Sequence, residues 1–248
     1  MSYRFIKLFS LKEPSEIVID HFKDFLKSNE INKCTFQIEQ GLYASTENRN
    51  QGYNYLLKVT SFEEDIENFK IELELEKEYK KLLKTIALYL NENHKTFSIY
   101  YEPSQQFTNL SIEKTQINHI VFLPFKSSCT DEEIDQSFLQ LKKLFNDLPG
   151  ISSFCYGKCE GSLEKSYVFE MGFSDKQARD SYLTNDQHVK VANYIIPLLE
   201  KGKESIIVFD YSPSKINKRP ELKSSSFFSS VETTAEIPET SSKLAATI

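Results

Sequence analysis

The chain of 248 residues carries a net charge of -6, and 40% of its residues are hydrophobic and 13% aromatic. This composition is typical of a globular protein with a Phe-rich core and excludes a disordered chain, while the acidic balance argues against nucleic acid or an anionic membrane as principal partner, since both require a cationic face. No stretch approaches the ~20 apolar residues of a membrane span and the N-terminus lacks a signal segment, so we expect a cytoplasmic protein.

The cysteines and histidines indicate neither a disulfide framework nor a metal site. Cys155 and Cys159 fall in one predicted strand, where four residues span ~13 Å along one face, too far for a disulfide. The four histidines show no zinc-binding spacing. We therefore expect free thiols, no metal and no cofactor. The residues concerned are Cys34, Cys129, Cys155, Cys159, His21, His94, His119 and His188.

Residues 1–101 predict the element order β-α-β-β-α-β. An apolar stripe at helical spacing follows Pro14, a residue favoured in the first turn of a helix. Ser61 and Glu64 form a capping box, which predicts the start of a second helical region that runs to about Leu90. The predicted strands are Tyr3–Phe9, Cys34–Ile38, Tyr53–Val59 and Lys95–Tyr101, and the stripe is Val18, Phe22, Phe25 and Leu26.

Residues 117–211 predict the same order again. Two further capping boxes, Thr130 with Glu133 and Ser174 with Gln177, predict the starts of two helices. The second of these helices breaks near Asn185 and resumes to Leu199. The predicted strands are His119–Phe125, Ile151–Gly157, Tyr167–Phe173 and Ser205–Tyr211, and the stripe of the first helix is Ile134, Phe138, Leu141 and Phe145.

The repeated order predicts two ferredoxin-like units, each an antiparallel four-stranded sheet with both helices on one face. The first strand of the second unit is apolar on both faces, with Val121 and Leu123 on one side and Ile120 and Phe122 on the other. A sheet of this kind needs a cover on its helix-free face, and the sheet of the other unit is the simplest one. We therefore expect an α+β fold in which two sheets pack into a pseudo-dimeric barrel.

Two segments differ in composition from these units. Residues 102–116 contain Pro103 and a polar run, and we interpret them as a linker. Residues 212–248 are rich in Ser, Thr, Glu, Pro and Lys, and they cannot bury enough apolar surface to order themselves. We therefore expect a disordered C-terminal tail.

The second unit resembles a known family, the stress-responsive A/B barrel (Dabb) domain of the dimeric α+β barrel superfamily. The matching features begin with His119 early in the opening strand. They continue with the Leu-Pro-Gly-Ile turn at Leu148–Ile151, the Phe-Ser pair at Phe173 and Ser174, and Tyr182 followed by His188. Because members of this family usually pair as dimers through their sheets, the resemblance implies that this chain is both partners fused in tandem, with the first copy diverged. We expect it to be a monomer.

The resemblance also implies a candidate site. Plant polyketide cyclases of this family close a linear polyketide by aldol condensation with residues that match His119, Tyr182 and His188. The family commonly has His-Pro shortly before the last histidine, where this chain has Asn185 and Asp186. The first copy has other residues at the three site positions, so one site per chain is expected, in the second copy. Those other residues are Tyr3, Phe69 and, near the last position, Tyr79.

Structural roles compete with catalytic ones at these positions. Tyr182 and His188 can satisfy loose backbone groups at the helix break, and His119 can be a hydrogen-bonded core residue. Glu170 can face the barrel interior as a partner for an imidazole, or it can be solvated at an edge. Two hypotheses follow: a non-catalytic, stress-related protein that binds a small apolar or phenolic ligand, and a cofactor-free cyclase or lyase. Haem or oxygen chemistry, known in the wider superfamily, has no additional ligand residue to support it.

Overall fold

A computed structural model describes residues 2–12, 16–27, 36–45, 47–61, 77–93, 95–112, 114–161 and 165–216. The strands are β1 Tyr3–Phe9, β2 Phe36–Leu42, β3 Tyr55–Ser61, β4 Thr96–Tyr101, β5 Gln105–Thr108, β6 Ile117–Pro124, β7 Ile151–Glu160, β8 Ser166–Phe173, β9 Ile207–Tyr211 and β10 Ser214–Ile216. The α-helices are α1 Glu16–Lys27, α3 Lys77–Ala87, α4 Asp131–Asp147, α5 Lys176–Thr184 and α6 Asp186–Ile195, and short 3₁₀ helices follow at Ile196–Leu198 (η2) and Gly202–Ser205 (η3).

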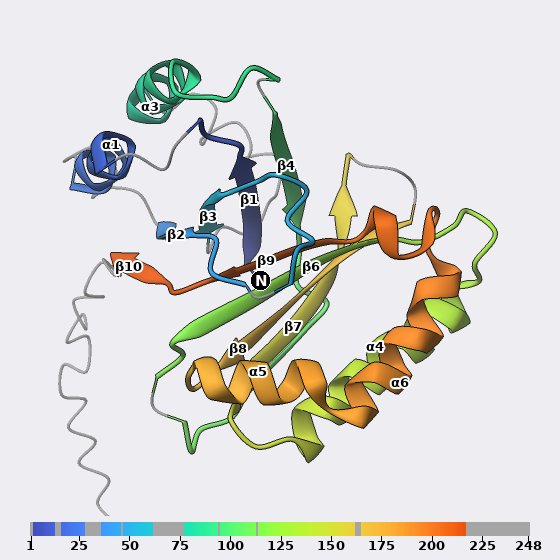
Figure 1. Cartoon of the computed structure of the whole chain (residues 1–248). Helices are drawn as coiled ribbons and strands as arrows, with labels where there is room; N and C mark the ends of the chain where they lie inside the picture. Colours follow the sequence, from blue (N-terminus) through green and yellow to red (C-terminus); the bar gives the residue numbers. More distant parts are fainter. Residues whose placement is uncertain are drawn as a thin grey trace, which may run out of the picture.

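The two halves of the chain have the same strand order. The first half pairs its strands as β2-β3-β1-β4 and the second as β7-β8-β6-β9, and the pairs within each set are antiparallel. In Figure 1, α1 and α3 lie outside the first set and α4, α5 and α6 lie outside the second, with all the strands between them. The ferredoxin-like α+β fold expected from the sequence is confirmed.

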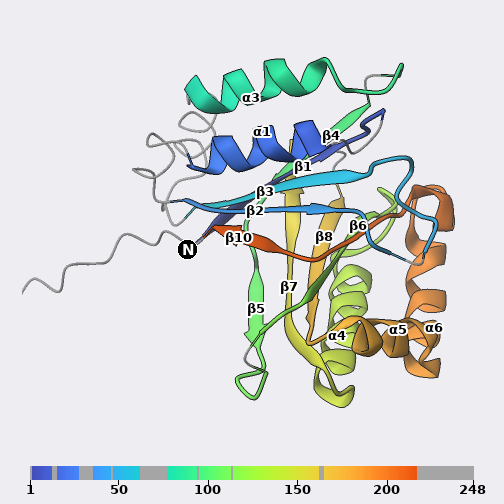
Figure 2. The same ribbon diagram turned by 60° about the vertical axis from the view of Figure 1, so that its left-hand side comes forward.

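The strands of both halves form one path that returns to its start. β4 pairs with β7 at Tyr100 and Tyr101, which joins the two sheets at one edge. β10 follows β9 directly and pairs with β2 at the opposite end of the path. Figure 2 shows β10 running from the second half to lie beside β2. The two sheets therefore enclose a barrel with the helices on its outside.

Three apolar clusters fill this arrangement. One lies between α1, α3 and the first sheet, and a second lies between α4, α5, α6 and the second sheet. The third fills the barrel interior with side chains from both sheets. β6 contributes Val121 and Leu123 to the second cluster and Ile120 and Phe122 to the third, as its two apolar faces predicted. The other sheet is thus the cover that this strand requires.

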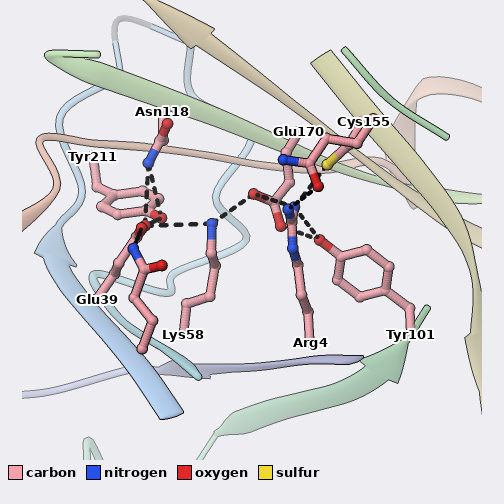
Figure 3. A network of polar contacts seen from close by, with 10 residues as sticks. Arg4, Glu39, Lys58, Tyr101, Asn118, Cys155, Glu170 and Tyr211 are labelled. Carbon is pink, nitrogen blue, oxygen red and sulfur yellow. Dashed lines mark hydrogen bonds and ion pairs between the residues drawn. The ribbon is translucent and has the colours of Figure 1, made fainter. Parts of the chain in front are cut away.

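One end of the barrel interior holds buried charges that connect the two halves (Figure 3). Lys58 of β3 lies 2.6 Å from Glu170 of β8 and 3.3 Å from Glu39 of β2. Arg4 of β1 lies 3.3 Å from Glu170 and donates to the sulfur of Cys155 at 2.7 Å. Hydroxyl and amide groups complete the network: Tyr101 donates to Glu170, and Tyr211 and Asn118 donate to Glu39.

Electrostatics keep these buried groups ionised. Burial alone would raise the pKa of Glu170, but the adjacent Lys58 and Arg4 outweigh it and lower that pKa to about 2. Burial alone would lower the pKa of Lys58, and the carboxylates of Glu170 and Glu39 raise it above its ordinary value instead. The charge of Glu170 is therefore compensated across the boundary between the two sheets, by Lys58 and Arg4 of the first half.

The predicted helix starts have different outcomes. Thr130 and Glu133 form the expected capping box at α4, with both reciprocal bonds present. The box predicted at Ser174 is wrong, because Asp175 is the N-cap and its side chain accepts from the backbone N of Ala178 at 2.8 Å. A carboxylate is a stronger acceptor than a hydroxyl at the positive end of a helix, which explains the shift by one residue. The box predicted at Ser61 and Glu64 lies largely outside the described residues.

Two segments outside the repeated units contain strands. The segment expected to be a linker, residues 102–116, contains β5, which pairs with β7. The segment expected to be a disordered tail begins with β10, because the free edge of β2 offers backbone partners to the chain that leaves β9. Residues 217–248 of that predicted tail lie outside the described residues. None of the helices in the described ranges combines the length and the apolar character that a membrane crossing requires.

Candidate functional site

The fold brings the three predicted site residues together on the helix side of the second sheet. His119 lies on β6, Tyr182 on α5 and His188 on α6. The ring centroids of His119 and Tyr182 are 5.9 Å apart, and those of Tyr182 and His188 are 4.3 Å apart. Tyr182 therefore lies between the two imidazoles, in contact with both.

The helix break that the sequence predicted produces this geometry. Asn185 is both the C-cap of α5 and the N-cap of α6, and its side chain accepts a hydrogen bond from the backbone N of Gln187 at 2.8 Å. After the break, Nδ1 of His188 donates to the carbonyl of Leu183 at 3.2 Å. The Asn-Asp pair thus turns the chain sharply enough to bring His188 back onto Tyr182, although the family pattern has His-Pro here.

Two charged residues that the sequence did not single out hold His119 in place. Nδ1 of His119 lies 2.5 Å from Oδ1 of Asp210, its partner across the β6–β9 ladder. The other carboxylate oxygen of Asp210 accepts from the guanidinium of Arg179 on α5. Arg179 and Asp210 are both fully buried. A single carboxylate within the apolar run of β9 was the signal that could have identified this partner.

Glu170 is not the partner of an imidazole. It is buried and faces the barrel interior, as one of its two predicted placements required, but it pairs there with Lys58 and Arg4. Glu170 and His119 project from opposite faces of the second sheet, because His119 belongs to the helix side. Asp210 takes the role that was proposed for Glu170.

Burial determines the protonation states around the site. Burial, with smaller contributions from the neighbouring His119 and Arg49, lowers the pKa of His188 to about 4, so this imidazole is neutral at pH 7. Burial raises the pKa of the Tyr182 phenol well above its ordinary value, and Glu47 and Asp210 raise it further. Burial would raise the pKa of Asp210, but His119 and Arg179 hold it below the ordinary value. Asp210 is therefore held as an anion beside His119.

A small apolar pocket lies next to His119 and His188. Its volume is about 60 Å³. Tyr182 does not line it, and the Tyr182 hydroxyl is buried without a hydrogen-bond partner among the described residues. The lining residues are Glu47, Arg49, His119, Val121, Leu123, Leu141, Phe169, His188, Ala192, Ile195, Ile196, Ile206 and Val208.

A larger hollow lies elsewhere on the surface and has a different character. It measures about 1000 Å³ and is lined by Glu102, Pro103, Ser104, Asp131, Lys158, Cys159, Glu160, Gly161 and Lys165. It is open, mostly polar, and contains none of the residues that the family resemblance points to. Within the described ranges there is also no group of three or more His, Cys, Asp or Glu side chains arranged to hold a metal ion. The small pocket is therefore the better candidate site.

Comparison with known proteins gives a family match for the second half of the chain. Residues 117–213 match the family model "Stress responsive A/B Barrel Domain", abbreviated Dabb. These residues form a Dabb domain. The domain contains β6 to β9 and the residues His119, Arg179, Tyr182, His188 and Asp210. The chain is also similar to olivetolic acid cyclase of Cannabis sativa, with 24% identity over 103 residues that cover 40% of this chain and 98% of the cyclase.

Solved structures share the fold of the Dabb domain together with the first half. An anthrone oxidase-like protein superposes with a TM-score of 0.60 at 11% identity, covering 86% of this chain and 91% of that chain. A protein of Fusobacterium nucleatum provisionally named a monooxygenase superposes with a TM-score of 0.59 at 10% identity, covering 88% of this chain and 94% of that chain. At these identities the likeness concerns the fold alone.

Proposed function

We propose that the Dabb domain binds a small organic ligand whose apolar chain enters the pocket and contacts His119. One observation carries this proposal: His119 and His188 line a pocket whose other lining residues, apart from Glu47 and Arg49, are apolar. Because Asp210 engages Nδ1 of His119, Nε2 is the ring nitrogen left for a ligand. A few fixed polar groups within apolar walls are the usual character of small-molecule sites.

The size of the pocket limits the ligand. An apolar cavity of about 150 Å³ in a protein core is known to bind benzene. The pocket measures about 60 Å³, so it accepts a chain of a few carbons rather than a ring. A linear polyketide would have to leave most of its length outside, or displace side chains of α6. This mismatch favours binding of a small compound over cyclisation of a long one.

Proton transfer is a second candidate function, because His119 has the arrangement of a general base. A buried carboxylate on Nδ1 fixes the tautomer in which Nε2 can take a proton. Such an imidazole could remove a proton next to a carbonyl group without a cofactor, which is the chemistry of a cyclase or lyase. The similarity to olivetolic acid cyclase supports this candidate. The buried Tyr182 hydroxyl does not, since Tyr182 lies outside the pocket lining.

We also propose that the chain is a tandem fusion of two related units, residues 1–101 and 117–211, with the first diverged. The identical strand order of the halves supports this, as does the barrel that their sheets enclose. The fused chain then needs no second copy, and light scattering should give a mass near 28.8 kDa. A mass near twice that value would contradict the proposal.

We propose a cytosolic location for the protein. The buried free thiols at Cys129, Cys155 and Cys159 support this location.

A thermal-shift and calorimetric titration tests the binding proposal. Butanone, butanamide and phenol are titrated into the wild type, His119→Gln, and Ala192→Leu, which fills the pocket from α6. A compound at a hundred times its Kd stabilises the fold by about 2.7 kcal/mol, a shift of roughly 5 to 10 °C for a chain of this length. We expect butanone or butanamide to bind the wild type, and to bind the two variants weakly or not at all. We expect phenol to bind the wild type less tightly than butanone and butanamide do. Equal binding by the wild type and Ala192→Leu would contradict the proposal.

Deuterium exchange separates binding from proton transfer. Butanone in D₂O exchanges the protons next to its carbonyl slowly, and NMR measures the rate. A general base in the pocket should accelerate this exchange in the wild type and not in His119→Gln. Binding without acceleration would leave the protein as a non-catalytic binder.

A further inference from the structure

The connection between β2 and β3 in the first half forms part of the wall of the Dabb domain pocket. The backbone N of Ala44 donates to the carbonyl of Asp210 at 2.8 Å, and the backbone N of Val208 donates to the carbonyl of Arg49 at 3.1 Å. Tyr43 packs against Phe209 with ring centroids 5.4 Å apart. Figure 2 shows this connection reaching across from the first sheet toward α6. Backbone bonds to β9 on two sides of the connection fix it beside the pocket.

This connection supplies charge that the Dabb domain itself does not place there. Glu47 and Arg49 line the pocket together with His119 and His188, while the remaining lining residues are apolar. Their side chains are 22% and 40% exposed, whereas the side chain of His119 is 3% exposed. His119 therefore lies at the inner end of the pocket, and the charged pair lies at its opening to solvent.

Glu47 and Arg49, the charged pair at the opening, form only a long ion pair. NH1 of Arg49 lies 3.8 Å from Oε1 of Glu47, which is longer than a hydrogen bond. The guanidinium thus keeps donors for a further acceptor, and its planar fork matches a carboxylate. The whole chain carries a net charge of -6, so an anionic ligand needs a local cation of this kind to approach.

We propose that Arg49 binds the carboxylate of a short-chain carboxylic acid whose apolar chain fills the pocket. This inference rests on the proposed ligand-binding function and adds the class of ligand. The carboxylate lies at the opening, beside Arg49, and the chain extends inward past Ala192 toward His119. Glu47 competes with the ligand for Arg49 and so limits its affinity. The first half of the chain thereby sets the specificity of the site in the second.

Calorimetric titration with three compounds of equal chain length tests this inference. Butanoate carries the carboxylate, butanamide is its uncharged counterpart, and butylamine carries the opposite charge. We expect the wild type to bind butanoate at least fivefold more tightly than butanamide, and butylamine more weakly than both. Arg49→Gln should bind butanoate and butanamide equally, with its affinity for butanamide unchanged. Glu47→Gln should bind butanoate two- to fivefold more tightly than the wild type does.

Matched controls separate failure of this inference from failure of the proposed function. Lys143→Gln removes an exposed cation of α4 and should leave the preference for butanoate intact. If butanamide binds the wild type as tightly as butanoate does, or if Arg49→Gln still prefers butanoate to butanamide, the inference on Arg49 is wrong. The proposal that the pocket binds a small ligand is unaffected by that result. If none of the three compounds binds, or if Ala192→Leu binds them as the wild type does, both proposals are wrong.

Discussion

Lys58 of β3 and Glu170 of β8 form an ion pair of 2.6 Å inside the barrel, and they belong to different halves of the chain. Both side chains are almost fully buried. Ions removed from water in this way are stable only when each is compensated, so each half carries a charge that it cannot accommodate alone. The pair therefore couples the folding of the two halves and fixes how their sheets face each other.

Neutralising Glu170 should strongly destabilise the protein. Glu170→Gln leaves Arg4 and Lys58 with Glu39 as their remaining buried carboxylate, and we expect a loss of about 3 to 5 kcal/mol in the free energy of unfolding. Urea denaturation measures this loss. Glu200→Gln, at an exposed position, is the control and should cost less than about 0.5 kcal/mol. A loss of similar size in both variants would show that the barrel charges do not couple the halves.

His188 should make stability depend on pH between about 4 and 6.5. Its pKa is lowered to about 4 in the folded protein, chiefly by burial, so the unfolded chain binds its proton more readily. Stability is then full above pH 6.5 and falls as pH drops toward 4, by about 3 kcal/mol at most. Unfolding should be measured at pH 7, 5.5 and 4.

The variant His188→Gln should lose less stability than the wild type across that window, because its side chain takes up no proton. His21→Gln, on α1, is the control for removal of a histidine. Glu170, whose pKa is lowered to about 2, also loses part of its stabilising effect below about pH 4.3, where the unfolded chain takes up the proton, but it does so equally in the wild type and in His188→Gln. Identical pH profiles for the wild type and His188→Gln would contradict the prediction.

The Tyr182 hydroxyl should contribute nothing to stability. It is buried without a partner among the described residues, so the fold gains nothing from the desolvated group. We expect Tyr182→Phe to leave the unfolding free energy unchanged or to raise it by up to about 1 kcal/mol. Tyr182→Leu, which also removes the ring contacts with His119 and His188, should instead cost about 1 to 3 kcal/mol. Marked destabilisation by Tyr182→Phe would mean that the hydroxyl has a partner in solution.

Asp210 should be more important for stability than the histidine it holds. Asp210→Asn leaves Arg179 buried with its bond to the half-exposed Asp180 as the remaining ion pair, and we expect a loss of about 3 to 5 kcal/mol. His119→Gln removes no charge partner of Arg179 and should cost less. The double variant Asp210→Asn/Arg179→Met should recover part of the loss, since no unpaired charge is left. Urea unfolding of the four proteins tests this order.

Gly157 should tolerate no side chain. A Cβ atom at this position would overlap the backbone oxygen of Glu102 and lie 2.8 Å from the Tyr101 ring, at the junction of β4 and β7. Backbone cannot yield as a flexible side chain does, so Gly157→Ala should lower the unfolding free energy by more than about 2 kcal/mol. Lys158→Ala, at the next position and exposed, should be nearly neutral. A similarly small effect of both changes would show that the junction of β4 and β7 has room for a side chain at position 157.

Local patterns in the sequence determined the secondary-structure elements of this protein and the way its sheets are covered. Periods of two and of 3.6 residues predicted the element order, and the two apolar faces of residues 120–123 predicted a barrel of two sheets. Asn185 marked the helix break correctly because capping depends on near neighbours. The same local signals, with the family resemblance, brought His119, Tyr182 and His188 forward as one candidate site.

The tertiary structure alone decided which groups surround that site. Asp210 lies 91 residues from His119, and Arg49 is farther still from His188, so no spacing along the chain connects them. Their meeting depends on strand register and on how one half docks against the other. Glu170 illustrates the limit: alternation along β8 gave the face on which it lies, but only the opposite sheet, with Lys58 and Arg4, gave its partners. The alternation of residues in the sequence predicts which face of a sheet a side chain occupies, and the packing of the two halves determines which side chains it contacts there.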